Sequence, residues 1–183
     1  MTAALLLIVA AGVVVVLIYN RLAHLQVQAD TAWADIDVQL KRRHDLIPNL
    51  VETVKGYASH EQESFEAVVA ARGAAVAARG PAQQQRAEQQ LAASLGQLFA
   101  LVESYPQLRA VESFNTLQND LSGIEEALQA ARRYYNAVVR DLNTSVVQFP
   151  SNLVATLFGI RAREFFELAD PSESAVPQVR FEG

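Results

Sequence analysis

The first 20 residues, MTAALLLIVAAGVVVVLIYN, contain no charged side chain, and this run constrains the fold more than any other feature. A helix over this stretch rises about 30 Å, which matches the hydrocarbon core of one bilayer. Its bulky residues are Leu5, Leu6, Leu7, Ile8, Val9, Val13, Val14, Val15, Val16, Leu17 and Ile18, followed by Tyr19 at the membrane interface. No face of the stretch is polar, which argues against a core helix of a soluble domain. We expect residues 1–20 to form a transmembrane anchor.

A cleaved signal peptide is the alternative interpretation of this run. Signal peptides carry basic residues ahead of the apolar stretch, and none is present here, although Val9-Ala10-Ala11 resembles a processing site. We therefore expect a retained anchor in the lipid bilayer. Because Arg21 and the triplet Lys41-Arg42-Arg43 follow the run and no Lys or Arg precedes it, the positive-inside rule predicts that the rest of the chain is cytoplasmic.

The composition of the chain is that of one globular body. With 51% hydrophobic residues among 183, the chain can bury one core and is short for two. Its 15 basic and 20 acidic residues give a net charge of -5, so we expect no nucleic-acid partner. Cysteine is absent, which excludes disulfides, a thiolate nucleophile and cysteine-ligated zinc.

Apolar residues after the anchor recur at helical spacing, and helix breakers divide them into four stretches. The first runs from the anchor to about Ser59, the second covers residues 60–80, the third covers residues 83–105, and the fourth runs from Pro106 to about residue 145. One stripe of the second contains Phe65, Val69, Arg72 and Val76. A stripe of the third contains Leu91, Leu95, Leu98, Val102 and Tyr105. A strand is supported only weakly, by the short segment AVPQVRF at residues 175–181.

The fourth stretch carries a heptad seam, which is typical of helices packed at a shallow angle. The seam consists of Phe114, Leu117, Leu121, Ile124, Leu128, Tyr135, Val138 and Leu142. We predict an all-α fold in which the anchor (1–20) continues into an antiparallel, four-helix-bundle-like domain (21–168), followed by a C-terminal tail (169–183). An extended coiled coil between chains is the alternative, because the seam alone does not distinguish the two.

Pro48 interrupts the first helix without shifting its apolar phase, so we expect a helix bend there. The missing N–H leaves the carbonyl of His44 for water or a neighbouring donor. The three cations at residues 41–43 project about 100° apart, so at least one of them must lie near the apolar stripe. Arg72 lies on such a stripe too. It either pairs with Asp35 or Asp37, or lays its stem along the core with its head in water.

Helix lengths predict where the chain ends. Two long helices enclose two short ones, so alternating directions bring the end of the fourth stretch back towards the membrane. The segment that follows contains Phe149, Leu157, Phe158, Arg161, Arg163, Phe165 and Phe166. In one interpretation its aromatics enter the membrane surface while its arginines meet lipid phosphates. In the other interpretation the aromatics plug the end of the bundle.

The sequence shows no pattern of catalytic or metal-binding residues. His24, His44 and His60 lie far apart, and none follows a glutamate by three residues as in di-iron bundles. The carboxylates fit solvated helix faces better than an acid–base pair. The sequence also lacks a glycine-rich phosphate loop and a nucleophile elbow. We expect no enzyme, no cofactor and no metal site.

Over residues 19 to 183 the chain resembles the LemA family of bacterial membrane proteins. The motifs that carry the resemblance are AWADIDVQLKRRHDLIPNLVETVKGYASHE, LFALVESYPQLRAVESFNTLQNDLSGIE, ARRYYNAVVRDLN and FPSNLVATLFGIRAREFFE. The resemblance implies one N-terminal helix in the bacterial inner membrane and a bundle of long helices. Family members include a magnetosome-associated protein and neighbours of membrane proteases or stress systems, so fold transfers better than function. His44 departs from the tyrosine expected there.

We therefore predict a non-enzymatic, membrane-anchored scaffold that assembles with copies of itself or with another membrane protein. Ala10-Ala11-Gly12 in the anchor permit close helix approach, which supports a homo-oligomer. A regulatory adaptor of a membrane protease or stress-response system is the alternative function. An enzyme of unrecognised type is a third.

Overall fold

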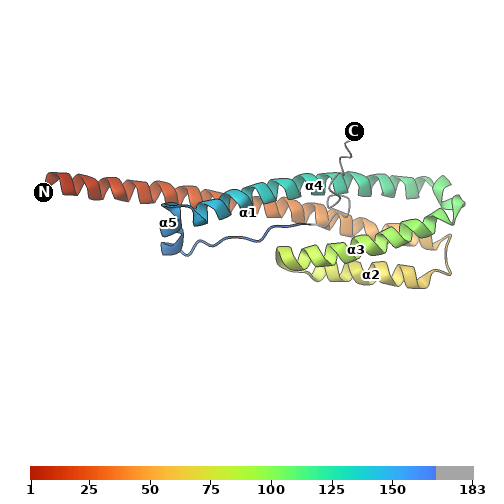
Figure 1. Ribbon diagram of the computed structural model, residues 1–183. Helices are drawn as coiled ribbons and strands as arrows, with labels where there is room; N and C mark the ends of the chain where they lie inside the picture. The colour runs from red at the N-terminus through yellow and green to blue at the C-terminus, as the bar shows by residue number, and fades with distance from the viewer. Residues whose placement is uncertain (168–183) are drawn as a thin grey trace, which may run out of the picture.

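The computed structural model of the protein (Figure 1) describes residues 1–167 and is all-α over that range, with no strand among those residues. Its elements are α1 (Thr2–Lys55), α2 (Gln62–Ala77), α3 (Gly80–Glu103), the 3-10 helix η1 (Pro106–Ala110), α4 (Glu112–Val147) and α5 (Ser151–Leu157). The all-α prediction is confirmed. The predicted tail at residues 169–183, with the AVPQVRF segment, lies outside the described residues.

The long axis of the molecule is α1, a single helix of 54 residues that rises about 80 Å. Its apolar first part projects alone, and α4 lies alongside the rest in the opposite direction (Figure 1). The middle of the contact between the two helices is a cluster of buried residues: Ala29, Ala32, Ile36 and Leu40 on α1, and Leu128, Tyr135, Val138 and Val139 on α4. Small alanines opposite larger side chains let the two helix axes run close together over this length.

The second half of α1 is covered by a hairpin of α2 and α3. The turn between them is made by Gly80, whose φ of 74° lies in the left-handed region, and Pro81 starts α3. The predicted stripe of α3 is correct, since Leu91, Leu95, Leu98 and Val102 are all buried. The predicted stripe of α2 is correct at Phe65 and wrong at Val69 and Val76. The helix buries Phe65, Val68 and Ala75, and leaves Val69 and Val76 about half exposed to solvent.

The return path along α4 starts later than expected. Pro106 begins the short 3-10 helix η1, which buries Leu108, and α4 begins only at Glu112. The expected path of the chain is present (Figure 1): α1 leads away from the apolar run, the shorter α2 runs part of the way back, α3 runs outwards again, and α4 returns towards the apolar run. In the seam, the buried members are Phe114, Leu128, Tyr135, Val138 and Leu142, whereas Leu117, Leu121 and Ile124 are half-buried.

Candidate functional site

The apolar run of α1 is solvent-exposed throughout residues 1–17, and α1 is the one helix among the described residues that is long and apolar enough to cross a membrane. The bulky anchor residues from Leu5 to Leu17 touch no other part of the described chain closely enough to be buried. Packing begins at Ile18, which is half-buried. Tyr19 lies against Phe158, with ring centroids 4.6 Å apart. Tertiary packing of the described chain thus starts where the apolar run ends.

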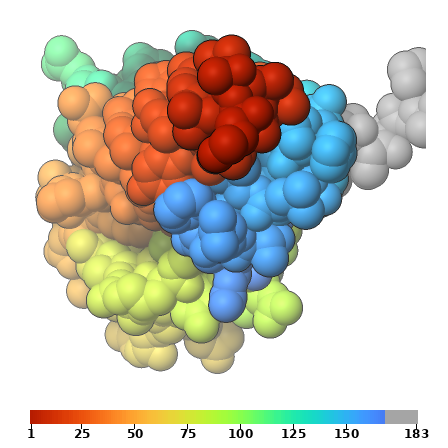
Figure 2. Space-filling view, turned by 90° about the vertical axis from the view of Figure 1, so that its left-hand side faces the viewer, coloured from red at the N-terminus to blue at the C-terminus, as the bar shows by residue number. Residues whose placement is uncertain are grey.

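The chain returns to that level at the end of α4, where α5 packs across α1. Leu22 and Leu142 form a small core with Val154, Ala155 and Ile160. Figure 2 looks along α1 from its N-terminal end and shows the α5 region beside the base of the apolar run. The exposed side chains of this region are Phe149 (74% exposed), Leu153 (62%), Leu157 (74%) and Phe158 (51%). One apolar face of α5 is therefore buried and another is open.

After α5 the chain runs as an extended segment, residues 160–167, back along α1 and α4 (Figure 1). Asn143 exchanges two hydrogen bonds with the backbone of Arg163, and Asn136 exchanges two with the backbone of Phe166, all between 2.8 and 2.9 Å. Seven helical residues rise about 10.5 Å, and three extended residues span about 10 Å. This match lets two asparagines on one face of α4 hold successive points of the segment.

Two residues expected at the membrane or at the end of the bundle lie elsewhere. The ring of Phe166 is fully buried halfway along α1 and α4, edge-on to Trp33 at 5.4 Å. The guanidinium of Arg163 pairs with Asp30 at 2.6 Å. Phe165 and Arg161 are exposed. The extended segment carries residues 163–166 away from α5, so Arg163 and Phe166 belong to the side of the bundle.

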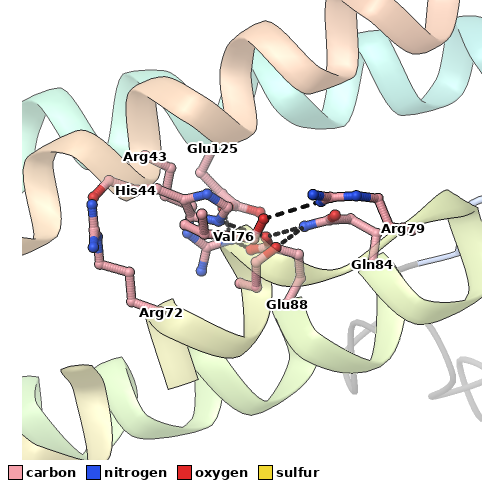
Figure 3. Close-up of polar contacts among 9 residues, drawn as sticks. Arg43, His44, Arg72, Val76, Arg79, Gln84, Glu88 and Glu125 are labelled. Atoms are coloured by element: carbon pink, nitrogen blue, oxygen red, sulfur yellow. Dashed lines mark hydrogen bonds and ion pairs between the residues drawn. The ribbon is translucent and has the colours of Figure 1, made fainter. Parts of the chain in front are cut away.

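A buried polar cluster joins the α2–α3 hairpin to α1 and α4 (Figure 3). Its centre is Glu88, whose side chain is fully buried. The Oε1 atom of Glu88 lies 2.7 Å from Nε2 of His44 and accepts a hydrogen bond from Gln84 at 2.8 Å. The Oε2 atom faces Nη1 of Arg43 at 3.4 Å, and the same Arg43 nitrogen lies 3.4 Å from Glu125 on α4. Both carboxylate oxygens therefore have donors, as a buried charge requires.

The side chain of Arg72 supplies the hydrogen-bond donor that Pro48 lacks. The helix α1 continues through Pro48, and Nε of Arg72 donates to the carbonyl oxygen of His44 at 2.6 Å. Of the two interpretations of Arg72, the ion pair with Asp35 or Asp37 is not found among the described residues, and its Nε bonds to the backbone instead. Proline has no N–H to offer this carbonyl, so the cation of α2 supplies the missing donor. The bend at Pro48 stays a prediction.

Beside the polar cluster, an open groove of about 660 Å³ separates α3 from α4. One wall contains Ala92, Ala93, Gly96 and Phe99 of α3, and the other contains Gln118, Leu121, Ser122 and Gln129 of α4. Arg43, Glu88 and the buried Arg132 line it as well. The groove explains why Leu121 is only half-buried, because its side chain forms part of the wall.

Sequence reasoning missed most of this cluster, although a signal for it was present. Arg43 and His44 lie three and four residues after buried Leu40, on the buried face of α1. Arg43 is the cation that had to lie near the apolar stripe. Glu88 lies three residues before buried Leu91 on α3, so its position on that stripe marked it as buried. Within residues 1–167, no three His, Asp or Glu side chains gather in a way that could hold a metal ion.

Comparisons with known proteins find relatives among magnetosome proteins. The magnetosome proteins MamQ 1 and MamQ 2 of Paramagnetospirillum magneticum are each 24% identical to the chain over 175 residues, which cover 81% of this chain and 64% of theirs. The magnetosome protein MamQ of Magnetospirillum gryphiswaldense is 21% identical over 189 residues, covering 88% of this chain and 70% of its own. The chain thus spans just under two thirds of the first two relatives. The model of the LemA family matches residues 32–181, so this chain belongs to the LemA family.

Proposed function

We propose that this protein is a non-enzymatic scaffold anchored in the bacterial inner membrane, with its helical bundle in the cytoplasm. The observation that carries the proposal is the continuity of α1, which passes from the apolar run into the bundle without a break or a linker. Up to Pro48 this helix transmits orientation, because sharp helix bends arise at proline or at similar interruptions and none precedes Pro48. Such a rod holds its outer end at a set distance from the bilayer, as a scaffold must.

The outer face of α2 supports self-association. Between Ala67 and Ala78 the only charged side chain is Arg72, and it is turned inwards to the carbonyl of His44. The outer face consists of Ala67, Val69, Ala70, Gly73, Ala74, Val76 and Ala77, all exposed. A helix that is apolar on all sides is normally covered on all sides. We take this face as the contact between copies.

The native mass of the full chain tests this contact. In lipid nanodiscs or mild detergent we expect an oligomer, and replacing Val69 and Val76 with lysine should shift the mass to that of a monomer. A matched control carries lysine at Val27 and Val38, which are similarly exposed on α1. A wild-type monomer across a concentration series would contradict self-association. An equal loss in both variants would contradict the role of α2.

The orientation has its own test, made simple by the absence of cysteine. A cysteine at Tyr57, exposed at the outer end of α1, is probed on intact cells with a membrane-impermeant thiol reagent. A cytoplasmic bundle should stay unlabelled until the cells are opened. Strong labelling of intact cells would place the bundle on the opposite side.

A further inference from the structure

We propose that α5, with Phe149 before it and Phe158 after it, makes a second membrane contact, which we call the foot. The foot lies in the interfacial region of the leaflet that contains the C-terminal end of the anchor. The inference rests on the proposed membrane anchor and adds a lipid-binding surface on a segment that lies 130 residues later in the chain. The foot is defined by the exposed side chains of Phe149, Leu153, Leu157 and Phe158. Its ligand is the boundary between lipid head groups and acyl chains.

The first argument is the apolar surface itself. Four large apolar side chains within ten residues are each at least half exposed. Leu153 and Leu157 are four residues apart and share one face of α5, while Val154 and Ala155 fill the opposite side against Leu22 and Leu142. Both faces of this short helix are apolar. One face packs on protein, and the other would be exposed to water unless a second apolar surface, such as a membrane, covered it. The amphipathic contact of interfacial helices has this composition.

The second argument is position. The ring of Phe158 lies 4.6 Å from that of Tyr19, the last residue but one of the charge-free run. If residues 1–20 fill one hydrocarbon core of about 30 Å, Tyr19 lies at its boundary and Phe158 lies at the same depth. Figure 1 shows α5 set across α1, and Figure 2 shows it facing the side from which the anchor projects. A helix across an upright anchor lies flat on the bilayer.

The third argument is charge. No Asp or Glu occurs in residues 142–163, which contain the foot, or in residues 1–29, which contain the anchor, so neither segment carries an acidic side chain that would repel lipid phosphates. Arg21 and Arg161 are exposed in these same segments. Arginine near an anionic surface is attracted to phosphate, and aromatic residues are favoured at the head-group level. The foot therefore combines an apolar face with an exposed arginine, Arg161, three residues after Phe158.

The end of α5 holds this surface in place. Gly159 has a φ of 69°, the amide of Ile160 donates to Ala155 at 2.9 Å, and the amide of Gly159 donates to Thr156 at 3.3 Å. This pattern is a Schellman cap, in which a left-handed glycine turns the chain away and a residue beyond it packs back on the helix. Ile160 is buried as a result. Phe158 stays on the open side while the chain leaves along α1.

Spin-label accessibility on the full chain in vesicles of phosphatidylethanolamine and phosphatidylglycerol tests the foot. Single cysteines replace Leu153 or Leu157 in the foot, Val9 in the anchor, and Tyr57 at the far end of the bundle as the aqueous control. All four positions are exposed, so a label disturbs no core contact. We expect labels at residues 153 and 157 to lose accessibility to a water-soluble nickel complex and gain accessibility to oxygen, relative to residue 57.

The label at Val9 separates this inference from the anchor on which it rests. If residue 9 is shielded from nickel while residues 153 and 157 are as accessible as residue 57, the foot is overturned and the anchor stands. If residue 9 is also open to nickel, the anchor itself fails and the foot with it. Shielding at residue 157 with spin–spin broadening at low protein-to-lipid ratio would put a second copy on this face, which also overturns a lipid contact.

Discussion

The side chain of Arg72 closes the gap that Pro48 leaves in α1, because its Nε donates to the carbonyl of His44 at 2.6 Å. This bond thus gives a hydrogen-bond donor to a carbonyl on α1. It fixes the position of Arg72, the single cation in the apolar part of α2. It also sets the position of α2 along α1, close to where His44 meets Glu88 of α3. Pro48, which removes a donor from α1, and Arg72, which replaces that donor, therefore act at the same carbonyl.

Removing the arginine should therefore matter only while the proline is present. We expect Arg72→Met, which keeps the aliphatic stem, to lower the free energy of unfolding by about 1–3 kcal/mol. In a Pro48→Ala background the amide of residue 48 can donate to the His44 carbonyl, and the loss should shrink by about 1 kcal/mol or more. Denaturant unfolding of all four proteins in detergent, followed by circular dichroism, measures the coupling. Equal losses in both backgrounds would mean that Arg72 acts through something other than this carbonyl.

Truncation of Glu88 should be among the most damaging single changes in the bundle. Glu88→Ala leaves Arg43 buried without one of its carboxylate partners, and we expect a loss of about 3–5 kcal/mol. Glu126→Ala, at an exposed position of α4, is the control and should stay within about 0.5 kcal/mol. The same unfolding measurement applies. A Glu88→Ala protein as stable as the control would show that the cluster contributes nothing to the fold.

The seam of α4 should be uneven in its contribution to stability. A uniform seam predicts losses of about 2–5 kcal/mol for Leu121→Ala or Ile124→Ala. The fully buried Leu128 should show a loss in that range when changed to alanine, whereas half-buried Leu121 and Ile124 should lose clearly less. Unfolding curves for the three variants test the order. A loss at Leu121 equal to that at Leu128 would indicate that the groove is closed in solution.

The two asparagines of α4 should control the extended segment independently of the bundle. Asn143→Ala removes two hydrogen bonds to the backbone of Arg163, so we expect the amide of Arg163 to exchange faster with solvent while the core amides of α4 do not change. Hydrogen exchange followed by mass spectrometry measures this. Asn119→Ala, an exposed asparagine on the same helix, is the control. Unchanged exchange at Arg163 would show that other contacts hold the segment.

Several features follow from local sequence because a helix repeats every 3.6 residues and a core needs one apolar face. The charge-free run, the phase kept across Pro48 and the stripe from Leu91 to Val102 predict α1 and α3 from neighbouring residues alone. The return of α4 towards the apolar run follows from the helix lengths and from alternating helix directions. These are properties of the chain that no distant residue changes.

Tertiary packing decided the rest. From Ala67 onwards α2 is apolar on all sides apart from Arg72, so its periodicity cannot tell the buried Val68 from the exposed Val69. The partners of Arg72 and Glu88 lie 28 and 44 residues away, and only the position of the hairpin on α1 brings them within reach. The aromatic residues after α4 look alike in composition, yet the Asn136 contact carries Phe166 into the side of the bundle and leaves Phe158 beside Tyr19. Local spacing identifies a helix and its apolar residues, whereas the pairing of a polar or aromatic side chain depends on distances that only the folded chain sets.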